Sequence, residues 1–256
     1  MSQATVYLIT GSNRGIGLGL VARILEKHDR AFVYAGARDP DNASALISLQ
    51  IRYPDRLSIV KCVSADGEGN TALAREIEKR HGYLDTVIAN AGVCDPTGDV
   101  SNIRIAQLEE HFHINVTGTI ILFQAVYGLL KKSVSPRFVP ISTRAASFDG
   151  RSIKFQSGGV AYGATKAALN WATRKIHFEN DWLVAFPVSP GPVNTDMLRD
   201  TVAADTSGLM KKMVDGLPNL PTVETVSVSL ISLIDGSTRE KDGGQFIHVD
   251  GTRVSW

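Results

Sequence analysis

The feature that most constrains the fold is a glycine-rich turn between a short apolar run and a helical run near the N-terminus. Residues 6–10 read Val-Tyr-Leu-Ile-Thr, a β-rich segment, and the chain is helical in character up to about residue 27. Between them, residues 11–17 read Gly-Ser-Asn-Arg-Gly-Ile-Gly. A strand, a glycine turn and a helix in this order allow the backbone to approach a pyrophosphate at the positive end of the helix. The spacing is Gly-x-x-x-Gly-x-Gly rather than Gly-x-Gly-x-x-Gly, and a turn without a ligand is the alternative.

Strand-like and helix-like segments alternate along the rest of the chain. Further strands are expected at residues 31–35, 57–63, 84–92, 137–143, 183–188 and 245–249. Helices are expected at residues 41–50, 70–81 (with Asn70 as the N-cap), 105–132, 159–180 and 223–234. This alternation predicts the α/β class: a single doubly wound, mostly parallel sheet with helices on both faces. We expect one domain, 1–256, in which the weakly periodic residues 196–219 form a flexible substrate loop.

Candidate binding residues follow the predicted strands. Ligands of doubly wound sheets bind at the carboxyl ends of the strands. Five glycine or polar residues lie at the carboxyl ends of predicted strands: Gly11, Arg38, Asn90, Thr143 and Thr195. The sequence therefore predicts a binding site along one edge of the sheet.

The end of the second strand indicates which dinucleotide would bind. An acidic residue there would hold the 2′-hydroxyl of NAD, whereas an arginine accommodates the extra phosphate of NADP. The sequence has Arg38 at this point, no acid before Asp39, and a second arginine, Arg14, in the glycine turn. Two guanidiniums suit one phosphate, so NADP(H) is favoured over the alternative that both arginines are ordinary surface residues.

A Tyr-x-x-x-Lys pair lies in the helix expected at residues 159–180. Tyr162 and Lys166 are four residues apart and share one helix face. A phenol loses its proton at about pH 10, and a nearby ammonium favours the phenolate and brings the group toward a useful range. A solvated surface pair is the alternative interpretation.

Composition excludes several classes of function. The net charge of +1 offers no field for nucleic acid or an anionic membrane. Apolar runs such as residues 119–126 fall short of the ~20 residues that span a bilayer. Two cysteines cannot form a disulfide framework, and His111 and His113 are two residues apart on a helix, so no metal site is expected. With no leader-like segment at the start, we expect a cytoplasmic protein.

Taken in order, these motifs resemble those of the short-chain dehydrogenase/reductases. The motifs that carry the resemblance are Thr10-Gly-x-x-x-Gly-x-Gly17, Asn90-Ala-Gly92, Asn115, Tyr162-x-x-x-Lys166 and Pro190-Gly191 with Thr195. More narrowly, the stretches around Tyr162 and around Trp182 are similar to fungal reductases of the norsolorinic acid ketoreductase-like group. The resemblance covers nearly the whole chain and implies a Rossmann-like fold.

The resemblance also implies roles for individual residues. Tyr162 would be the general acid that protonates a carbonyl oxygen, and Lys166 would hold the nicotinamide ribose and bias Tyr162 toward the phenolate. Asn115 would anchor a water-mediated proton path at a local helix irregularity. The substrate-orienting hydroxyl would belong to Thr143, with Ser142 as the alternative. The residues implied for cofactor binding are Gly11, Asn13, Arg14, Gly15, Ile16, Gly17, Arg38, Asn90, Ala91, Gly92, Tyr162, Lys166, Pro190, Gly191, Val193 and Thr195.

These expectations lead to one preferred function and two alternatives. The preferred function is an NADPH-dependent ketoreductase of secondary metabolism, acting as a homodimer or homotetramer on a bulky, aromatic or polycyclic ketone. Phe148, Phe155 and Trp182 could shape the pocket for such a substrate. One alternative uses the same pocket for cyclisation, dehydration or epimerisation, because Thr143 and Ala146 depart from the family pattern. The other is a non-catalytic NADP-sensing module.

Overall fold

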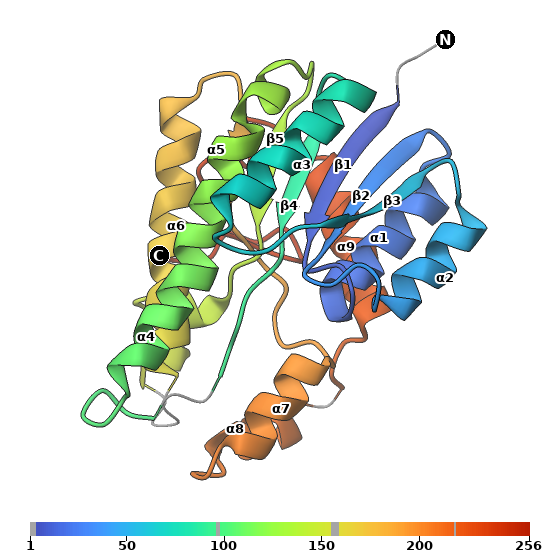
Figure 1. Ribbon diagram of the computed structural model, residues 1–256. Helices are drawn as coiled ribbons and strands as arrows, with labels where there is room; N and C mark the ends of the chain where they lie inside the picture. The colour runs from blue at the N-terminus through green and yellow to red at the C-terminus, as the bar shows by residue number, and fades with distance from the viewer. Residues whose placement is uncertain (1–3, 96–97, 155–158, 218) are drawn as a thin grey trace.

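The computed structural model describes residues 4–95, 98–154, 159–217 and 219–256, and its centre is a six-stranded parallel sheet (Figure 1). The strands are β1 (Thr5–Thr10), β2 (Ala31–Ala37), β3 (Leu57–Lys61), β4 (Thr86–Ala89), β5 (Arg137–Pro140) and β6 (Val184–Ala185). Their order in the sheet is β3-β2-β1-β4-β5-β6. The order reverses between β1 and β4, which confirms the predicted doubly wound topology and opens a crevice at the carboxyl ends of those two strands.

A proline divides the strand that was predicted over residues 183–188. Pro187 has no N–H to donate to a ladder, and β6 stops before it. The chain resumes as β7 (Val188–Ser189), which pairs in parallel with β8 (Ile247–His248). Ile141, just after β5, bridges to Val188, so this two-stranded ladder continues the edge of the main sheet.

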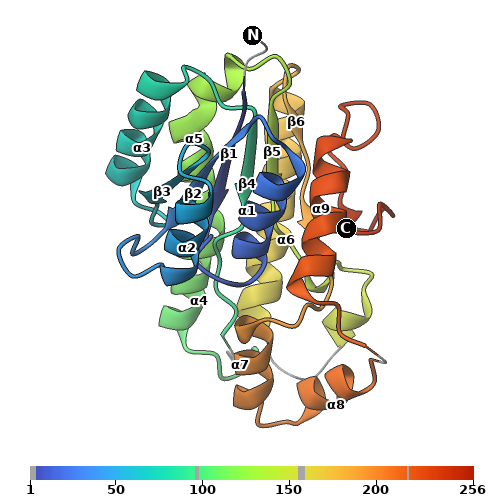
Figure 2. The same ribbon diagram turned by 90° about the vertical axis from the view of Figure 1, so that its right-hand side faces the viewer.

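Helices cover both faces of the sheet (Figures 1 and 2). One face carries α1 (Gly15–Lys27), α2 (Ser44–Arg52) and α9 (Val223–Asp235); the other carries α3 (Gly67–Arg80), α5 (Gly118–Lys131) and α6 (Val160–Glu179). Alternate residues of β1 point to opposite faces, as the pleat requires. Tyr7 and Ile9 join one buried apolar cluster, and Val6 and Leu8 join the other. Both sides of the sheet are therefore buried, which fixes the positions of the strand ends.

The start of α3 differs from the prediction. Asn70 lies inside the helix and is buried, whereas Asp66 is the N-cap and accepts from the Gly69 N–H at 2.9 Å. The preceding residue, Ala65, has φ of 62°, a left-handed conformation that L side chains rarely adopt. The turn packs tightly against α5, since a Cβ added at Gly118 would lie 3.0 Å from the Ala65 nitrogen.

The helix expected over residues 105–132 is interrupted once. It runs as α4 (Ile105–Phe112), a π-helix (His113–Thr117) and α5, so the predicted irregularity falls on Asn115. By length and composition alone, Ile105–Lys131 is the one helix of the described chain that could cross a membrane. Its apolar residues Leu122, Val126 and Leu129 are buried in the cluster on the sheet, as in a core helix.

Two helices occupy the segment predicted to be a flexible substrate loop. They are α7 (Asp196–Ala204) and α8 (Leu209–Asp215), and neither contains a buried residue. Both views show them beyond the carboxyl edge of the sheet, apart from the main body (Figures 1 and 2). The flexibility of this segment and its contact with substrate stay predictions.

Candidate active site

The glycine turn after β1 is packed so closely that two of its glycines have no room for a side chain. Gly11 has φ of 64°, and a Cβ there would lie 2.9 Å from the Ala91 Cα. A Cβ at Gly17 would lie 2.2 Å from the Gly11 carbonyl oxygen. Because these neighbours are backbone atoms, the turn could accept a side chain only by moving. Gly15, with φ of 57°, has no backbone atom within 4 Å of its added Cβ, so its outer side is open.

The ends of β1 and β4 are joined by hydrogen bonds from Thr10 and Asn90. The Thr10 hydroxyl oxygen accepts from the backbone N–H groups of Asn90 at 3.1 Å and Ala91 at 3.0 Å. The Asn90 side-chain amide donates to the carbonyls of Thr10 at 2.9 Å and Gly11 at 3.1 Å. Asn90 therefore holds the glycine turn in place, a structural role that its position in the sequence did not reveal.

The two arginines predicted to select the dinucleotide follow neighbouring strands. Thr10 at the end of β1 is in register with Gly36 in β2, so the segments that carry Arg14 and Arg38 both begin at the carboxyl edge of the sheet. Both side chains are exposed. The Arg14 guanidinium lies 3.7 Å from the Asp196 carboxylate at the start of α7, a contact that the sequence did not predict. Asn13 is also exposed in the turn.

The segment after β7 brings the last predicted cofactor residues to the same turn. It begins with Pro190 and Gly191, whose φ is 73°, and it continues through the buried Val193. Thr195 caps α7 by accepting from the Leu198 N–H at 3.3 Å. A Cβ placed on Gly15 would lie 3.7 Å from the Thr195 methyl group, so α7 starts beside the glycine turn.

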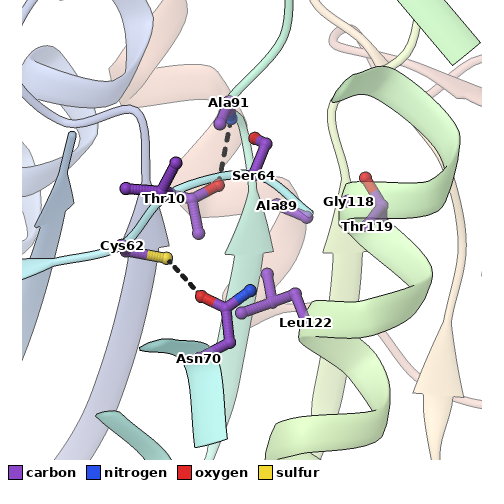
Figure 3. Close-up of a pocket in the computed structure, with 10 residues that line it drawn as sticks. Thr10, Cys62, Ser64, Asn70, Ala89, Ala91, Gly118, Thr119 and Leu122 are labelled. Carbon is purple, nitrogen blue, oxygen red and sulfur yellow. Dashed lines mark hydrogen bonds between the residues drawn. The ribbon is translucent and has the colours of Figure 1, made fainter. Parts of the chain in front are cut away.

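A cavity of about 10 Å³, room for roughly one water molecule, lies below this crevice (Figure 3). In Figure 3 the Cys62 thiol points toward the Asn70 side chain, to whose amide oxygen it donates at 3.4 Å. Val63 lines the cavity, and the carboxylate of the nearby Asp66 accepts the capping hydrogen bond of α3. The full lining is Thr10, Cys62, Val63, Ser64, Asn70, Ala89, Ala91, Gly118, Thr119 and Leu122. The lining of this cavity therefore contains no carboxylate.

Tyr162 and Lys166 project from α6 as the spacing predicted. The Lys166 ammonium lies 5.8 Å from the centre of the Tyr162 ring and donates to the Ile141 carbonyl at 2.8 Å. Burial raises the pKa of Tyr162 far above its ordinary value, and the nearby Cys94 raises that pKa further. Burial lowers the pKa of Lys166 to about 8. The phenol of Tyr162 is therefore neutral at pH 7 in this structure. The expected bias of Tyr162 toward the phenolate stays a prediction.

The Asn115 side chain, in the π-helix, uses both its oxygen and its nitrogen in hydrogen bonds within the protein. Its side-chain oxygen accepts from the Val93 N–H at 2.9 Å, and its amide nitrogen donates to the Val93 carbonyl at 3.0 Å. The same nitrogen donates to the Thr165 hydroxyl at 3.1 Å, one turn of α6 from Tyr162. The Asn115 side chain thus holds the strand end beyond Gly92 against the tyrosine helix.

The two candidate substrate-orienting hydroxyls face different surroundings. Ser142 is buried and donates to the Asn170 side-chain oxygen at 2.6 Å. The partly exposed Thr143 accepts from the Ala145 N–H at 3.2 Å, in a short 3-10 helix, Arg144–Ala146. That acceptance leaves the Thr143 hydroxyl proton available to an incoming oxygen atom.

The aromatic residues expected around the substrate are dispersed. Trp182 packs edge-on against Tyr127, with ring centres 5.4 Å apart, beside one of the two core clusters. Phe148 is 68% exposed, and Phe155 lies outside the described residues. Within the ranges that the structure describes, no three His, Cys, Asp or Glu residues gather as a metal site would require.

These features define a doubly wound α/β protein with a glycine turn at its topological switch point, a fold class in which dinucleotides bind. The chain belongs to the short chain dehydrogenase family, whose family model matches residues 5–206, and hence to a family of oxidoreductases. It is 34% identical over 260 residues to the norsolorinic acid ketoreductase of Aspergillus parasiticus, covering 99% of this chain and 92% of that protein. It is also 34% identical to a short chain dehydrogenase of Penicillium aethiopicum, gsfK, over 99% of both chains.

A solved structure agrees with this assignment. The NADPH-bound carbonyl reductase from chicken fatty liver superposes with a TM-score of 0.84 and 27% sequence identity, and the match covers 100% of both chains.

Proposed function

We propose that this protein is an NADPH-dependent ketoreductase that acts on a bulky, aromatic or polycyclic ketone of secondary metabolism. The observation that carries the proposal is the partly buried, neutral phenol of Tyr162 beside the buried Lys166 ammonium. Among the described residues no hydrogen-bond acceptor engages the Tyr162 hydroxyl, so its proton is available to a substrate. The names of two fungal relatives, both norsolorinic acid ketoreductases, support ketone reduction.

The chain fits a nicotinamide dinucleotide. Gly11 and Gly17 pack where a side chain would force the backbone apart, and the open side of Gly15 leaves room for a pyrophosphate at the N-terminus of α1. Arg14 and Arg38 favour the 2′-phosphate of NADPH over the bare ribose of NADH. When bound, the reduced nicotinamide supplies the hydride that the carbonyl carbon accepts.

The protein's own contribution is to orient the ketone and to supply a proton. The Thr143 hydroxyl, whose oxygen already accepts from Ala145, donates to the carbonyl oxygen and orients it. Tyr162 then gives its phenolic proton to that oxygen as negative charge develops there. The Lys166 ammonium, buried and held by the Ile141 carbonyl, stabilises the phenolate that remains. Ser142 takes no part in the proton transfer, because Asn170 occupies its hydroxyl.

Replacing Tyr162 by Phe tests the proposal. With NADPH and a panel of polycyclic ketones, the wild type should consume NADPH and form alcohol in equal amounts. Tyr162→Phe should bind NADPH normally but lose about 10³-fold in kcat, since it keeps the ring and lacks only the hydroxyl group that supplies the proton. Turnover unchanged in Tyr162→Phe would refute the general-acid assignment. Product without NADPH consumption would instead support cyclisation, dehydration or epimerisation, and NADPH binding without any turnover would support a sensor.

The exposed apolar residues of two adjoining helices support a second proposal, that the protein forms a homodimer or homotetramer. Ile105 and Phe112 of α4 and Trp171 and Phe178 of α6 are all exposed, and α4 lies against α6. Such side chains are stabilised when a second copy of the chain covers them. Light scattering should give a mass of two or four chains, and Trp171→Glu should halve it. A wild-type mass of one chain would contradict the proposal.

A further inference from the structure

The segment Val93–Asp95, which follows β4, forms one wall of the candidate active site and is held from three directions. At its start the chain passes very close to the catalytic pair. A Cβ added at Gly92 would lie 2.9 Å from the Asn115 side-chain oxygen and 3.4 Å from the Lys166 ammonium nitrogen. A shift of this segment would therefore change the space beside Lys166.

His111 holds the far end of this wall. It is 1% exposed, lies at the end of α4 one turn before Asn115, and uses both of its ring nitrogens. The Asp95 backbone N–H lies 3.2 Å from Nε2, and the Gln107 carbonyl lies 2.8 Å from Nδ1. A backbone N–H only donates and a carbonyl only accepts, so Nε2 is the acceptor and the proton is on Nδ1. The imidazole ring thus connects α4 to the Val93–Asp95 wall through one hydrogen bond at each ring nitrogen.

Helix α7 reaches the same wall from the opposite side. The Thr201 hydroxyl lies 3.0 Å from the Cys94 carbonyl and 2.8 Å from the Met197 carbonyl of its own helix, so its single proton is shared between them. The same hydroxyl is 3.8 Å from the Cys94 sulfur. Because α7 has no buried residue, this contact and the Arg14–Asp196 pair are the main polar attachments between α7 and the site in the described chain.

The backbones of three consecutive residues are therefore hydrogen-bonded to three different side chains: Val93 to Asn115, Cys94 to Thr201 and Asp95 to His111. We propose that His111 is a positioning residue: by holding the Asp95 amide it fixes the Val93–Asp95 wall and, through Cys94 and Thr201, the docking of α7 over the ketone end of the site. The inference rests on the proposed ketoreductase function for its kinetic consequence, though not for its structural one.

Two substitutions of His111 separate the hydrogen bond from simple packing. In His111→Leu the new side chain fills a similar volume but offers no hydrogen-bond acceptor. In His111→Gln the amide oxygen can accept from the Asp95 N–H at about the place of Nε2. The matched control is His113→Leu, the same change two residues along at an exposed position. In the protein without cofactor, the Asp95 amide should exchange at least about 10-fold faster in His111→Leu. Exchange should stay within about threefold of wild type in His111→Gln and His113→Leu.

The kinetic consequence follows from where the wall lies. In His111→Leu the KM for the ketone should rise about 10-fold while kcat and the Kd for NADPH change less than threefold, since the glycine turn is untouched. Thr201→Val should raise the same KM, and the double variant should show less than the product of the two effects, because both act through one segment. His111→Gln should restore most of the KM.

The outcomes distinguish this inference from the proposed function. Unchanged Asp95 exchange in His111→Leu, or multiplicative effects of His111→Leu and Thr201→Val, would overturn the positioning role. A uniform loss of thermal stability with an unchanged KM would do the same, because it would assign His111 to packing alone. If the wild type reduces no ketone, the ketoreductase proposal fails while faster exchange at Asp95 still supports the structural role.

Discussion

Helix α6, which carries the proposed catalytic pair, and the helical pair α7–α8 are attached to the rest of the protein in opposite ways. In α6, Thr165, Lys166 and Asn170 are buried and hydrogen-bonded to other elements. The described residues of α7 and α8 include no buried side chain, and α7 meets the body through exposed or shared polar contacts. The groups proposed to do chemistry are thus fixed by the core, whereas few buried contacts attach α7 and α8 to the rest of the protein.

One added methyl group should have the largest effect in the closely packed body of the protein, at the glycine turn, and a much smaller one between α7 and α8. A Cβ at Gly17 would clash at 2.2 Å with the Gly11 carbonyl, so Gly17→Ala should weaken NADPH binding by more than about 100-fold and destabilise the protein by about 2 kcal/mol or more. Gly208, between α7 and α8, has φ of 69° and open space around it, so Gly208→Ala should cost about 1 kcal/mol locally and leave NADPH affinity unchanged. Fluorescence titration and urea unfolding measure both effects. Comparable NADPH affinities in the two variants would remove the contrast.

The buried ammonium of Lys166 should make stability depend on pH. Its pKa is about 8 in the folded protein against an ordinary value of 10.5, so between these values the unfolded chain binds a proton that the folded one does not. Stability therefore rises with pH in this window, by about 2 kcal/mol between pH 7 and pH 10. Lys166→Met should lack this rise. Urea unfolding of the cofactor-free protein at a series of pH values checks it, and parallel curves for the two proteins would contradict it.

Relieving backbone strain in the scaffold should have a smaller effect. Ala65 adopts φ of 62°, which costs about 1 kcal/mol for a residue with a Cβ. Ala65→Gly should stabilise the protein by about 0.5 kcal/mol, because the greater freedom of glycine in the unfolded chain offsets part of the gain. The control Ala22→Gly, in the interior of α1, should destabilise by about 1 kcal/mol. Thermal unfolding gives both values, and destabilisation by Ala65→Gly would show that the turn is not strained.

The smallest effect is expected where α7 meets the glycine turn. Arg14 and Asp196 are 61% and 48% exposed, and such a pair contributes less than about 1 kcal/mol. In Asp196→Asn, Arg14 loses a competitor for the proposed 2′-phosphate, so the Kd for NADPH should fall about two- to threefold at low salt and less at high salt. The Kd for NADH should not change. Equal changes for both dinucleotides would mean that Arg14 does not contact that phosphate.

The parts of the structure that the sequence predicted are those with a local pattern. The glycine turn, the Tyr162 helix and the alternating strands are each encoded within about twenty residues, and the structure has them. The choice between Ser142 and Thr143 was left open because the partner that occupies Ser142, Asn170, lies 28 residues away. Periodicity missed α7 because the helix is short: its nine residues make only about two and a half turns, too few to establish a helical period from the sequence. The start of α7 could nevertheless have been predicted from the sequence. Thr195 is a suitable N-cap residue, and a carboxylate such as that of Asp196 stabilises the first turn of a helix.

The π-helix at His113–Thr117 has a consequence for how one helix serves two surroundings. A π turn takes up about one residue more than an α turn, which offsets the angular register of everything downstream by about 100° relative to an unbroken helix. Before the offset, His111 is the buried residue of α4 and faces the strand end; after it, a row of leucine, phenylalanine and valine side chains faces the sheet. One additional residue thus rotates the polar N-terminal part of the helix relative to its apolar C-terminal part, so that each part faces its own neighbour within one continuous helical run.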